Sequence, residues 1–328
     1  MKSALVTGAA GFLGYHICAQ LLKEHYYVIG LDNFITGSPQ NISDLKNAYP
    51  EKFYFANHDV STPWEVWQNW QNSIPTECFT SLVSVFHFAS VASPHLFDKC
   101  SLEILAANSQ GLKNAIAFAD QHKAQVIFAS TSEIYGSSTQ PLNENNWGYV
   151  NSFGPRSCYD EAKRFGEALI YSSNLVNNTQ HGVVRIFNTY GPRMNPTDER
   201  VVQQFIKNAL ENKDFLIYGD GTQTRSFCYV DDLISGIIMY AQSKISDPLN
   251  LGNDHEITIV ALAELIQQLI PCSSKIQFSN KRRDDPIKRQ PELKKAYQML
   301  MPWKPTVPLQ EGVLRTIQHI KGVSSYAT

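Results

Sequence analysis

The sequence predicts an α/β protein with a doubly wound parallel sheet, followed by a smaller mixed α/β region toward the C-terminus. Through the first half, short apolar runs alternate with helical stretches. A glycine-rich turn at residues 8–14 directly follows the first apolar run and opens the first helical stretch. After about residue 189, prolines and glycines break this alternation.

The expected strands of the sheet, in order, are residues 4–6, 27–31, 53–55, 83–88, 125–130 and 182–187. The clearest helical stretches between them are residues 12–22 and 102–122. Strands that are apolar almost throughout are typical of a parallel sheet covered by helices on both faces. A helix that connects two parallel strands makes a right-handed crossover, so the expected topology is a doubly wound sheet.

The later part of the chain predicts a second, less regular domain. Pro192, Pro196, Gly219 and Gly221 interrupt the pattern, and helical stretches return at residues 200–212, 231–242, 258–270 and 309–321. We assign residues 1–188 plus about 224–250 to the sheet domain, and about 189–223 plus 251–320 to the smaller one.

Composition narrows the class of protein. The chain has 328 residues and a formal net charge of −2, which does not favour nucleic acid or an anionic membrane as the main partner. No apolar run approaches the length of a membrane span. The six cysteines show no metal-ligand spacing, so we expect no metal site and free thiols in a reducing compartment. The first strand leaves no room for a targeting segment, which predicts a cytoplasmic protein.

The glycine-rich turn indicates a dinucleotide site. Gly8, Gly11 and Gly14 give the spacing G-x-x-G-x-x-G between a strand and a helix. Glycines there permit a tight turn and let a pyrophosphate approach a helix N-terminus. Asp32 ends the second strand, where a carboxylate accepts hydrogen bonds from ribose hydroxyls and repels a 2′-phosphate. The pattern therefore favours NAD over NADP, and the alternative is a glycine-rich turn without a cofactor.

A second pattern, Tyr159-x-x-x-Lys163, places a phenol and an ammonium one helical turn apart. A nearby ammonium favours the phenolate, so such a tyrosine can accept a proton from a substrate hydroxyl. The same spacing recurs at Tyr240 and Lys244, which we interpret as a chance copy at the end of a helix that faces a loop. Tyr159 is preferred because it follows the strand ending at Ser130, and strand ends build the sites of α/β sheets.

Polar residues end that same strand. Thr131 and Ser132 could bind a substrate hydroxyl, and Glu133 could act as an acid, a base or an electrostatic element. The alternative is an ordinary turn with a helix cap.

Taken together, these residues resemble the extended short-chain dehydrogenase/reductases, and in particular the UDP-glucuronate decarboxylases. The likeness runs from residue 3 to about 315. It is carried by residues 31–37, 57–60, 129–136, 154–164, 185–194, 218–225 and 284–289.

The resemblance implies a role for each matching residue. Tyr159, supported by Lys163, would help to oxidise C4 of the sugar, with Thr131 and Ser132 holding the substrate near C4. Glu133 and Arg289 would assist decarboxylation, with Arg289 placed to protonate C5. The positions that would bind the nucleotide sugar are Asn188, Val202, Tyr218, Gln223, Arg225 and Arg289. Those that would bind NAD are Gly8, Gly11, Phe12, Leu13, Gly14, Asp32, Asn33, Phe34, Thr36, Gly37, Asp59, Val60, Phe88, Ala89, Ser90, Asn108, Tyr159 and Lys163.

The implied reaction converts UDP-glucuronate to UDP-xylose. Oxidation at C4 creates a ketone β to the carboxylate, carbon dioxide leaves, and the hydride returns to C4. The family also implies a homodimer that pairs through the helices at residues 102–122 and 159–171.

Three alternatives stay open: a nucleotide-sugar epimerase, a 4,6-dehydratase, and a non-catalytic NAD-binding sensor. Glu133 and the preceding Ser132 argue against the first two, and the presence of the catalytic set argues against the third. The sequence also departs from the decarboxylases at Val91, Phe97, Ser152 and Ala162, and the change at Phe97 falls where a tyrosine would reach the sugar.

Overall fold

The computed structural model describes residues 1–64, 70, 73–195, 197–280 and 289–324. Its centre is a parallel sheet of seven strands in the order β11-β6-β5-β4-β1-β2-β3. The strands are β1 (Ser3–Thr7), β2 (Tyr27–Asp32), β3 (Phe53–Asn57), β4 (Leu82–His87), β5 (Gln125–Thr131), β6 (Gly182–Ile186) and β11 (Leu249–Leu251). The doubly wound sheet and all six predicted strands are therefore confirmed.

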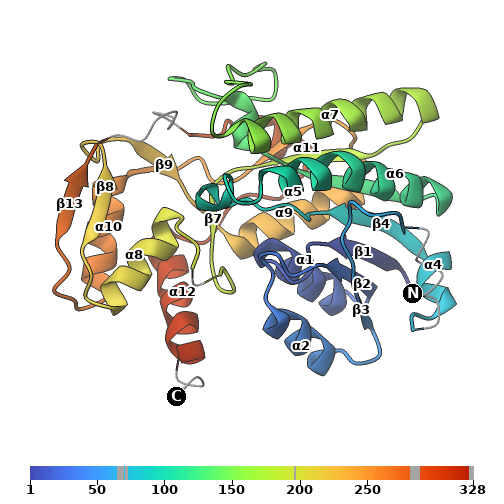
Figure 1. The fold of residues 1–328 in the computed structure, drawn as a ribbon, viewed down its shortest axis with the longest axis horizontal. Coiled ribbons are helices and arrows are strands. Elements are labelled where there is room, and N and C mark those ends of the chain that lie inside the picture. The colour runs from blue at the N-terminus through green and yellow to red at the C-terminus, as the bar shows by residue number, and fades with distance from the viewer. Residues whose placement is uncertain (65–69, 71–72, 196, 281–288, 325–328) are drawn as a thin grey trace.

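Helices cover both faces of the sheet (Figure 1). One face carries α1 (Phe12–Lys23), α2 (Pro39–Ala48) and α9 (Val230–Ser243). The other carries α5 (Ser101–Ala106), α6 (Leu112–Gln121) and α7 (Ser157–Asn177), and the short α4 (Thr76–Thr80) packs at the edge. Because successive strand side chains point to opposite faces, Ala4 and Val6 pack with Ile17, whereas Leu5 packs with Leu112 in a second core cluster.

The predicted long helix over residues 102–122 is confirmed, with one irregularity. Residues Ala107–Gly111 between α5 and α6 form a π-helical turn. Asn108 is fully buried in this turn, and its amide donates to the Ile104 carbonyl at 2.8 Å and to Ser90 Oγ at 2.9 Å. Such turns commonly occur at functional sites. Here the turn ties the helix to the loop that follows β4.

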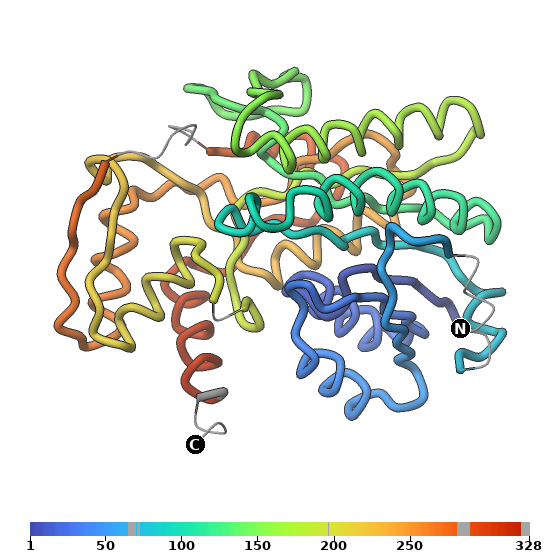
Figure 2. Tube along the Cα trace, viewed as in Figure 1, coloured from blue at the N-terminus to red at the C-terminus, as the bar shows by residue number. Residues whose placement is uncertain are grey.

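The second part of the molecule contains three two-stranded pairs. They are the parallel pairs β7 (Thr189–Tyr190) with β10 (Cys228–Tyr229) and β8 (Phe215–Tyr218) with β13 (Ile276–Ser279), and the antiparallel pair β9 (Thr224–Ser226) with β12 (Glu256–Thr258). Three helices follow the predicted stretches closely: α8 (Val201–Leu210), α10 (Ile259–Leu269) and α12 (Leu309–Ser324). A fourth helix, α11 (Lys294–Met299), was not predicted from the pattern. Figure 2 shows the N-terminus, in blue, on the side of the main sheet and helix α12, in red, in the second part of the molecule.

Parallel strands align their carboxyl ends along one edge of the sheet. Thr7 at the end of β1 is in register with Leu31 of β2 and His87 of β4, and Thr131 at the end of β5 is in register with Ile186 of β6. Segments far apart in the chain therefore open onto one side of the sheet, where a site can form.

Candidate active site

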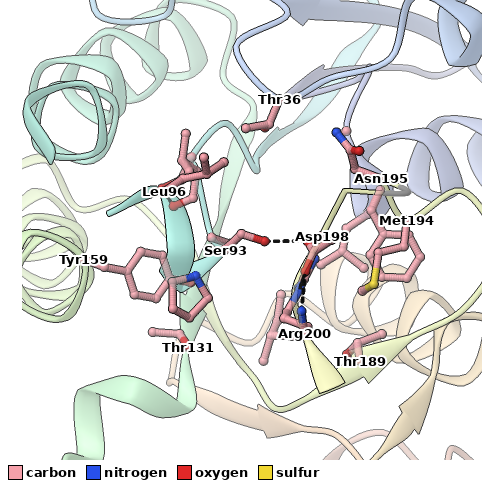
Figure 3. A pocket seen from close by; sticks show the side chains of 18 of the residues that line it. Thr36, Ser93, Leu96, Thr131, Tyr159, Thr189, Met194, Asn195, Asp198 and Arg200 are labelled. Atoms are coloured by element: carbon pink, nitrogen blue, oxygen red, sulfur yellow. Dashed lines mark hydrogen bonds and ion pairs between the residues drawn. The ribbon is translucent and has the colours of Figure 1, made fainter. Parts of the chain in front are cut away.

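A cavity of about 680 Å³ lies at this edge of the sheet, and residues of the second part complete its wall. It is large enough for a sizeable ligand, since binding pockets commonly hold about 300–1,000 Å³. Figure 3 shows part of it, with Tyr159 and Thr131 on one side and Asp198 and Arg200 on the other.

Most of the residues singled out from the sequence line this cavity. From the expected NAD site these are Gly8, Gly11, Phe12, Leu13, Gly14, Asp32, Asn33, Thr36, Asp59, Val60, Phe88, Ala89, Ser90, Tyr159 and Lys163. All of the expected catalytic and sugar-nucleotide residues line it too: Thr131, Ser132, Glu133, Arg289, Asn188, Val202, Tyr218, Gln223 and Arg225. Phe34, Gly37 and Asn108 lie behind the wall rather than on it. Residues 284–288 of the matching string lie outside the described residues.

The glycine turn leaves no room for side chains. A Cβ added to Gly14 would lie 1.9 Å from the Gly8 carbonyl oxygen, and one added to Gly8 would lie 2.9 Å from the Ala89 nitrogen. Gly8 also has a φ of +74°, which side chains rarely permit. At Gly11, the N-cap of α1, no side chain caps the helix and no acidic residue occupies the first turn. This bare helix N-terminus beside a glycine cradle fits the pyrophosphate of a dinucleotide.

Asp32 is held at the end of β2 by main-chain donors. Its Oδ2 accepts from the Ala10 nitrogen at 3.0 Å, and its Oδ1 accepts from the Phe34 nitrogen at 2.7 Å. Burial raises the pKa of the Asp32 carboxyl, and these N–H groups oppose that rise. A Cβ on Gly37 would come within 2.8 Å of Oδ1, so Gly37 supports the carboxylate without lining the cavity. The fixed acceptor fits a ribose diol.

Tyr159 and Lys163 lie in the first turns of α7, with only 7% and 3% of their surface exposed. Burial raises the pKa of Tyr159 to about 12, while a hydrogen bond with Thr131 acts to lower it. Burial also lowers the pKa of Lys163 to about 7, and its Nζ lies 5.7 Å from the centre of the Tyr159 ring. Burial is therefore the largest influence on the pKa of both groups, and the expected effect of the Lys163 ammonium on the Tyr159 pKa stays a prediction.

Glu133 is the centre of a charged cluster. Its Oε2 pairs with Arg156 Nη2 and with Arg289 Nη2, each at 2.6 Å. Burial acts to raise the pKa of the Glu133 carboxyl, but Arg289 and Arg156 outweigh it and hold that pKa below its ordinary value. Arg289 is 3% exposed and also donates through Nη1 to the Ser132 carbonyl. Glu133 and Arg289 are thus in contact although 156 positions separate them in the sequence.

Thr131 both caps a turn and lines the cavity. Its hydroxyl accepts from the Glu133 nitrogen at 3.3 Å and caps the 3₁₀ turn Ser132–Tyr135 (η4). The same side chain lines the cavity beside Tyr159 (Figure 3). The helix-cap alternative and a place in the site are therefore compatible.

Sequence reasoning gave no role to Arg156, although it stands three residues before Tyr159 in a matching string. Its guanidinium lies 5.7 Å from the centre of the Phe97 ring, and that ring stacks on Tyr159 with the centroids 5.0 Å apart. Phe97 is thus a packing partner of the tyrosine. Val91 and Ala162 belong to the same buried cluster, so three of the four departures from the decarboxylases lie around Tyr159.

A second missed group joins the two parts of the molecule. The Ser93 hydroxyl donates to Asp198 Oδ2, and Arg200 holds the same carboxylate through Nη2 at 2.8 Å and Nε at 3.0 Å (Figure 3). Ser93 follows β4, whereas Asp198 and Arg200 precede α8. No spacing in the sequence connects these residues.

The second Tyr/Lys pattern lies elsewhere. Tyr240 is fully buried in α9, where its hydroxyl accepts from the Val183 nitrogen at 2.9 Å and donates to the Asp247 carbonyl at 2.8 Å. It does not line the cavity. Its position outside the cavity lining, bonded to the loop at Asp247, agrees with the interpretation as a chance copy, which stays a prediction.

Two further properties concern the described residues only. They contain no group of three or more His, Cys, Asp or Glu side chains that could hold a metal ion. None of their helices is both long and apolar enough to cross a membrane.

Comparison with solved structures places the fold among nucleotide-sugar enzymes. The UDP-glucuronic acid 4-epimerase of Bacillus cereus, in complex with UDP-glucuronic acid and NAD, superposes with a TM-score of 0.84 at 26% identity, covering 98% of this chain and 99% of that one. The UDP-glucose 4-epimerase of Thermus thermophilus, in complex with NAD, gives 0.83 at 25% identity, with 98% and 99% covered.

Sequence comparison is more specific. The profile of the NAD dependent epimerase/dehydratase family matches residues 4–252. UDP-glucuronic acid decarboxylase 1 of Danio rerio is 40% identical over 319 residues, which is 97% of this chain and 72% of the relative. UDP-glucuronic acid decarboxylase 6 of Arabidopsis thaliana is 38% identical over 311 residues, or 94% and 86%. The chain belongs to the NAD-dependent epimerase/dehydratase family, within the branch of the UDP-glucuronic acid decarboxylases.

Proposed function

We propose that this chain is an enzyme that decarboxylates UDP-glucuronate to UDP-xylose through a 4-keto intermediate, with NAD as its cofactor. The observation that carries the proposal is the Glu133–Arg156–Arg289 cluster beside Tyr159 in one cavity. The identity with curated UDP-glucuronic acid decarboxylases supports it.

The glycine cradle and Asp32 would hold NAD. The pyrophosphate would lie against Gly8, Gly11 and Gly14, and the adenosine ribose against Asp32. Bound NAD would accept a hydride from C4 of the sugar and later return it. Asn33 donates to Asp59 Oδ2 at 3.1 Å and so braces the loops on the adenosine side.

Tyr159 would remove the proton from the C4 hydroxyl. Its side chain points into the cavity, and Thr131 lies beside it (Figure 3). Proton transfer by a positioned group typically contributes about 10²–10⁴-fold. The Lys163 ammonium would lie near the bound cofactor, and its positive charge would stabilise the Tyr159 phenolate as it forms.

The charged cluster would act on the carboxylate end of the sugar. Arg156 and Arg289 both contact Glu133, and they would also attract a sugar carboxylate. Arg156 additionally lies 3.9 Å from Asp160, which shares its charge. When the β-keto acid loses carbon dioxide, Arg289 would stabilise the resulting enolate, and C5 would then take a proton from solvent at the charged cluster. Because a guanidinium rarely releases its proton near neutral pH, its contribution is chiefly electrostatic. Glu133 would repel the sugar carboxylate and so favour the state after carbon dioxide leaves.

The uridine diphosphate would occupy the wall formed by the second part of the molecule. Gln223 donates to the Tyr218 carbonyl at 2.7 Å, and Arg225 donates to the Thr224 carbonyl at 2.8 Å, so both side chains are fixed beside the cavity. Asn188 and Val202 line the same region. We also propose the division given above, with residues 1–188 plus about 224–250 forming the NAD-binding domain. The place of β11 in the main sheet supports it.

An epimerase or 4,6-dehydratase is the alternative reaction, and a non-catalytic NAD-binding sensor is the third. The buried Phe97 and Val91 beside Tyr159 bear on the shape of the sugar pocket and hence on the substrate. Against an epimerase stands Glu133 with its two arginines, a cluster suited to a carboxylate that must leave.

Product analysis tests these possibilities. The protein is incubated with UDP-glucuronate and NAD, and the released sugar nucleotide is identified by NMR. We expect UDP-xylose together with carbon dioxide, and no turnover by Tyr159→Phe. UDP-galacturonate would indicate an epimerase, and unchanged substrate together with tight NAD binding would indicate a sensor. Either result would overturn the proposed reaction.

We also propose a homodimer that pairs through the helices at residues 102–122 and 159–171. Leu102 is 74% exposed and Tyr171 is 71% exposed, although both are large apolar side chains. Light scattering at micromolar concentration should give twice the monomer mass, and a monomer would contradict the proposal.

A cytoplasmic location is proposed on the free state of all six cysteines, and imaging of a tagged chain tests it.

A further inference from the structure

Behind the charged cluster lies a hydrogen-bond network centred on Tyr135. This residue ends the 3₁₀ turn that also carries Ser132 and Glu133, and it is 2% exposed. Its hydroxyl accepts from Arg185 Nη1 at 2.8 Å and donates to Asn250 Oδ1 at 2.7 Å. Asn250 is fully buried in β11. One hydroxyl therefore links the catalytic turn to the edge strand of the sheet.

Asn250 passes this link to the segment that follows Arg289. Its amide nitrogen donates to the Leu142 carbonyl at 2.9 Å and to the Glu292 carbonyl at 3.4 Å. Leu142 in turn donates to the Gln290 carbonyl, and the Glu292 nitrogen donates to the Leu142 carbonyl, both at 2.8 Å. These bonds form an isolated bridge between Leu142 and Pro291. The main chain next to Arg289 is thus fixed on both sides of Pro291.

The side chain of Arg289 completes a closed series of hydrogen bonds, which we call the circuit, that runs through Tyr135 and Asn250. It returns to Glu133 Oε2 at 2.6 Å and to the Ser132 carbonyl, two and three residues before Tyr135. Both ends of Arg289 are therefore connected to the same turn. Its guanidinium contacts the turn directly, and its main chain is connected to the turn through Asn250 and Tyr135. Placement matters because an error of about 1 Å in a reacting group can cost about 100-fold in rate.

We propose that Tyr135 and Asn250 are positioning residues for the decarboxylation step, which set Arg289 against Glu133. Neither side chain lines the cavity. The inference rests on the proposed function, because it assigns a consequence to the placement of Arg289. It predicts that breaking the link spares the oxidation at C4, which Tyr159 and Lys163 govern.

The link can be broken without removing the other supports of the turn. In Tyr135→Phe, Arg185 keeps its two bonds to Glu167, at 2.7 and 3.0 Å, and its bond to the Glu144 carbonyl at 3.0 Å. Helix α7, which carries Tyr159, also stays joined to the turn through Arg164 and the Ile134 carbonyl. The substitution thus removes only the two bonds of the Tyr135 hydroxyl, to Arg185 and to Asn250.

The kinetic test uses the full chain saturated with NAD and rapidly mixed with UDP-glucuronate, with NADH absorbance and carbon dioxide followed separately. For Tyr135→Phe we expect NADH to form within about twofold of the parental rate and carbon dioxide release to slow roughly tenfold. NADH should therefore accumulate during the reaction. Asn250→Asp keeps the acceptor for Tyr135 but removes the donor to Leu142 and Glu292, and it should give the same separation of rates.

Tyr240→Phe is the matched control. It removes another buried tyrosine hydroxyl that makes two hydrogen bonds, but one that lies outside the cavity and the circuit. A general loss of stability would affect both variants alike. If Tyr135→Phe slows both steps equally, or matches Tyr240→Phe, the positioning role is refuted.

Amide hydrogen exchange separates this inference from the reaction itself. The Leu142 and Glu292 amides form the bridge. Their exchange should be faster than in the parent protein in Tyr135→Phe and should stay at the parental rate in Tyr240→Phe. Should the parent protein form no NADH from UDP-glucuronate, the proposed function fails, while the exchange result still decides whether Tyr135 holds the Arg289 segment. Unchanged exchange in Tyr135→Phe overturns the inference in either case.

Discussion

The two ends of the cavity are built in different ways. The part of the cofactor end around the glycine turn consists of main-chain atoms and the Asp32 carboxylate, drawn from residues 8–37 and the loop after β4. The sugar end consists of charged side chains: Glu133 meets Arg156 across 23 positions of the sequence and Arg289 across 156. The first end depends on the absence of side chains, and the second depends on their assembly by the fold.

This difference predicts how mutations should damage each end of the cavity. At the cofactor end, an added methyl group meets backbone that cannot move, so damage is steric and local. At the sugar end, removal of one partner leaves a buried charge without its counterion, which is costly. Mutations should therefore separate cofactor binding from the chemistry at the sugar carboxylate.

The largest effect is expected at Tyr159, where the two ends meet. Tyr159→Phe keeps the ring stacked on Phe97 but removes the group that accepts the C4 proton. We expect NADH formation from UDP-glucuronate to fall by about 10³–10⁴-fold, with NAD binding retained. Stopped-flow absorbance measures the loss, and Tyr240→Phe should stay near the parental rate. NADH formation at a tenth of the parental rate or more would refute the assignment.

A smaller effect is expected at the cofactor end from Gly14→Ala. The new Cβ would lie 1.9 Å from the Gly8 carbonyl, so the turn must open and NAD affinity should fall by about two orders of magnitude. Calorimetric titration with NAD measures the change. Gly322→Ala is the control, because a Cβ there meets nothing within 4 Å. Equal NAD affinities in the two variants would remove the steric account of this end.

Asp32→Asn should narrow the preference for NAD over NADP by weakening the binding of NAD. The parent should be stabilised more by NAD than by NADP at equal concentration, because the carboxylate accepts from ribose hydroxyls and repels a 2′-phosphate. Loss of one charge-assisted bond, about 1.5–3 kcal/mol, should narrow the preference by roughly 10–100-fold. Thermal shift assays with both cofactors measure it. Equal stabilisation of the parent by NAD and NADP would contradict the role of Asp32.

The smallest effect concerns pH and the sugar end. Burial and the nearby Glu133 raise the pKa of Asp160 from 3.8 to about 7. The folded state therefore binds more protons than the unfolded state between these values, and Asp160 lowers stability as pH rises from about 4 to 7. Asp160→Asn removes this loss, so its melting temperature relative to the parent should rise between pH 5 and pH 8. A difference that is constant with pH would show that Asp160 titrates normally.

What the sequence predicts follows the same division. The six predicted strands, the helical stretches at residues 12–22 and 102–122 and the glycine turn rest on local patterns, and the structure confirms them. Glu133 and Arg289 could be named only through a family resemblance, and their contact depends on the bridge at Leu142, which no spacing encodes. Arg156 and the Ser93–Asp198–Arg200 group went without a role because their partners lie on other elements. The burial that sets the pKa of Tyr159 and Lys163 is likewise a property of the packed fold.

The separation of the two steps is the central claim, and Arg289→Ala and Glu133→Ala test it most directly. In a rapid-mixing assay with UDP-glucuronate and NAD, both variants should still form NADH, while carbon dioxide release slows by about two to four orders of magnitude, or roughly 3–5 kcal/mol. Release of carbon dioxide at the parental rate by these variants would contradict the assignment.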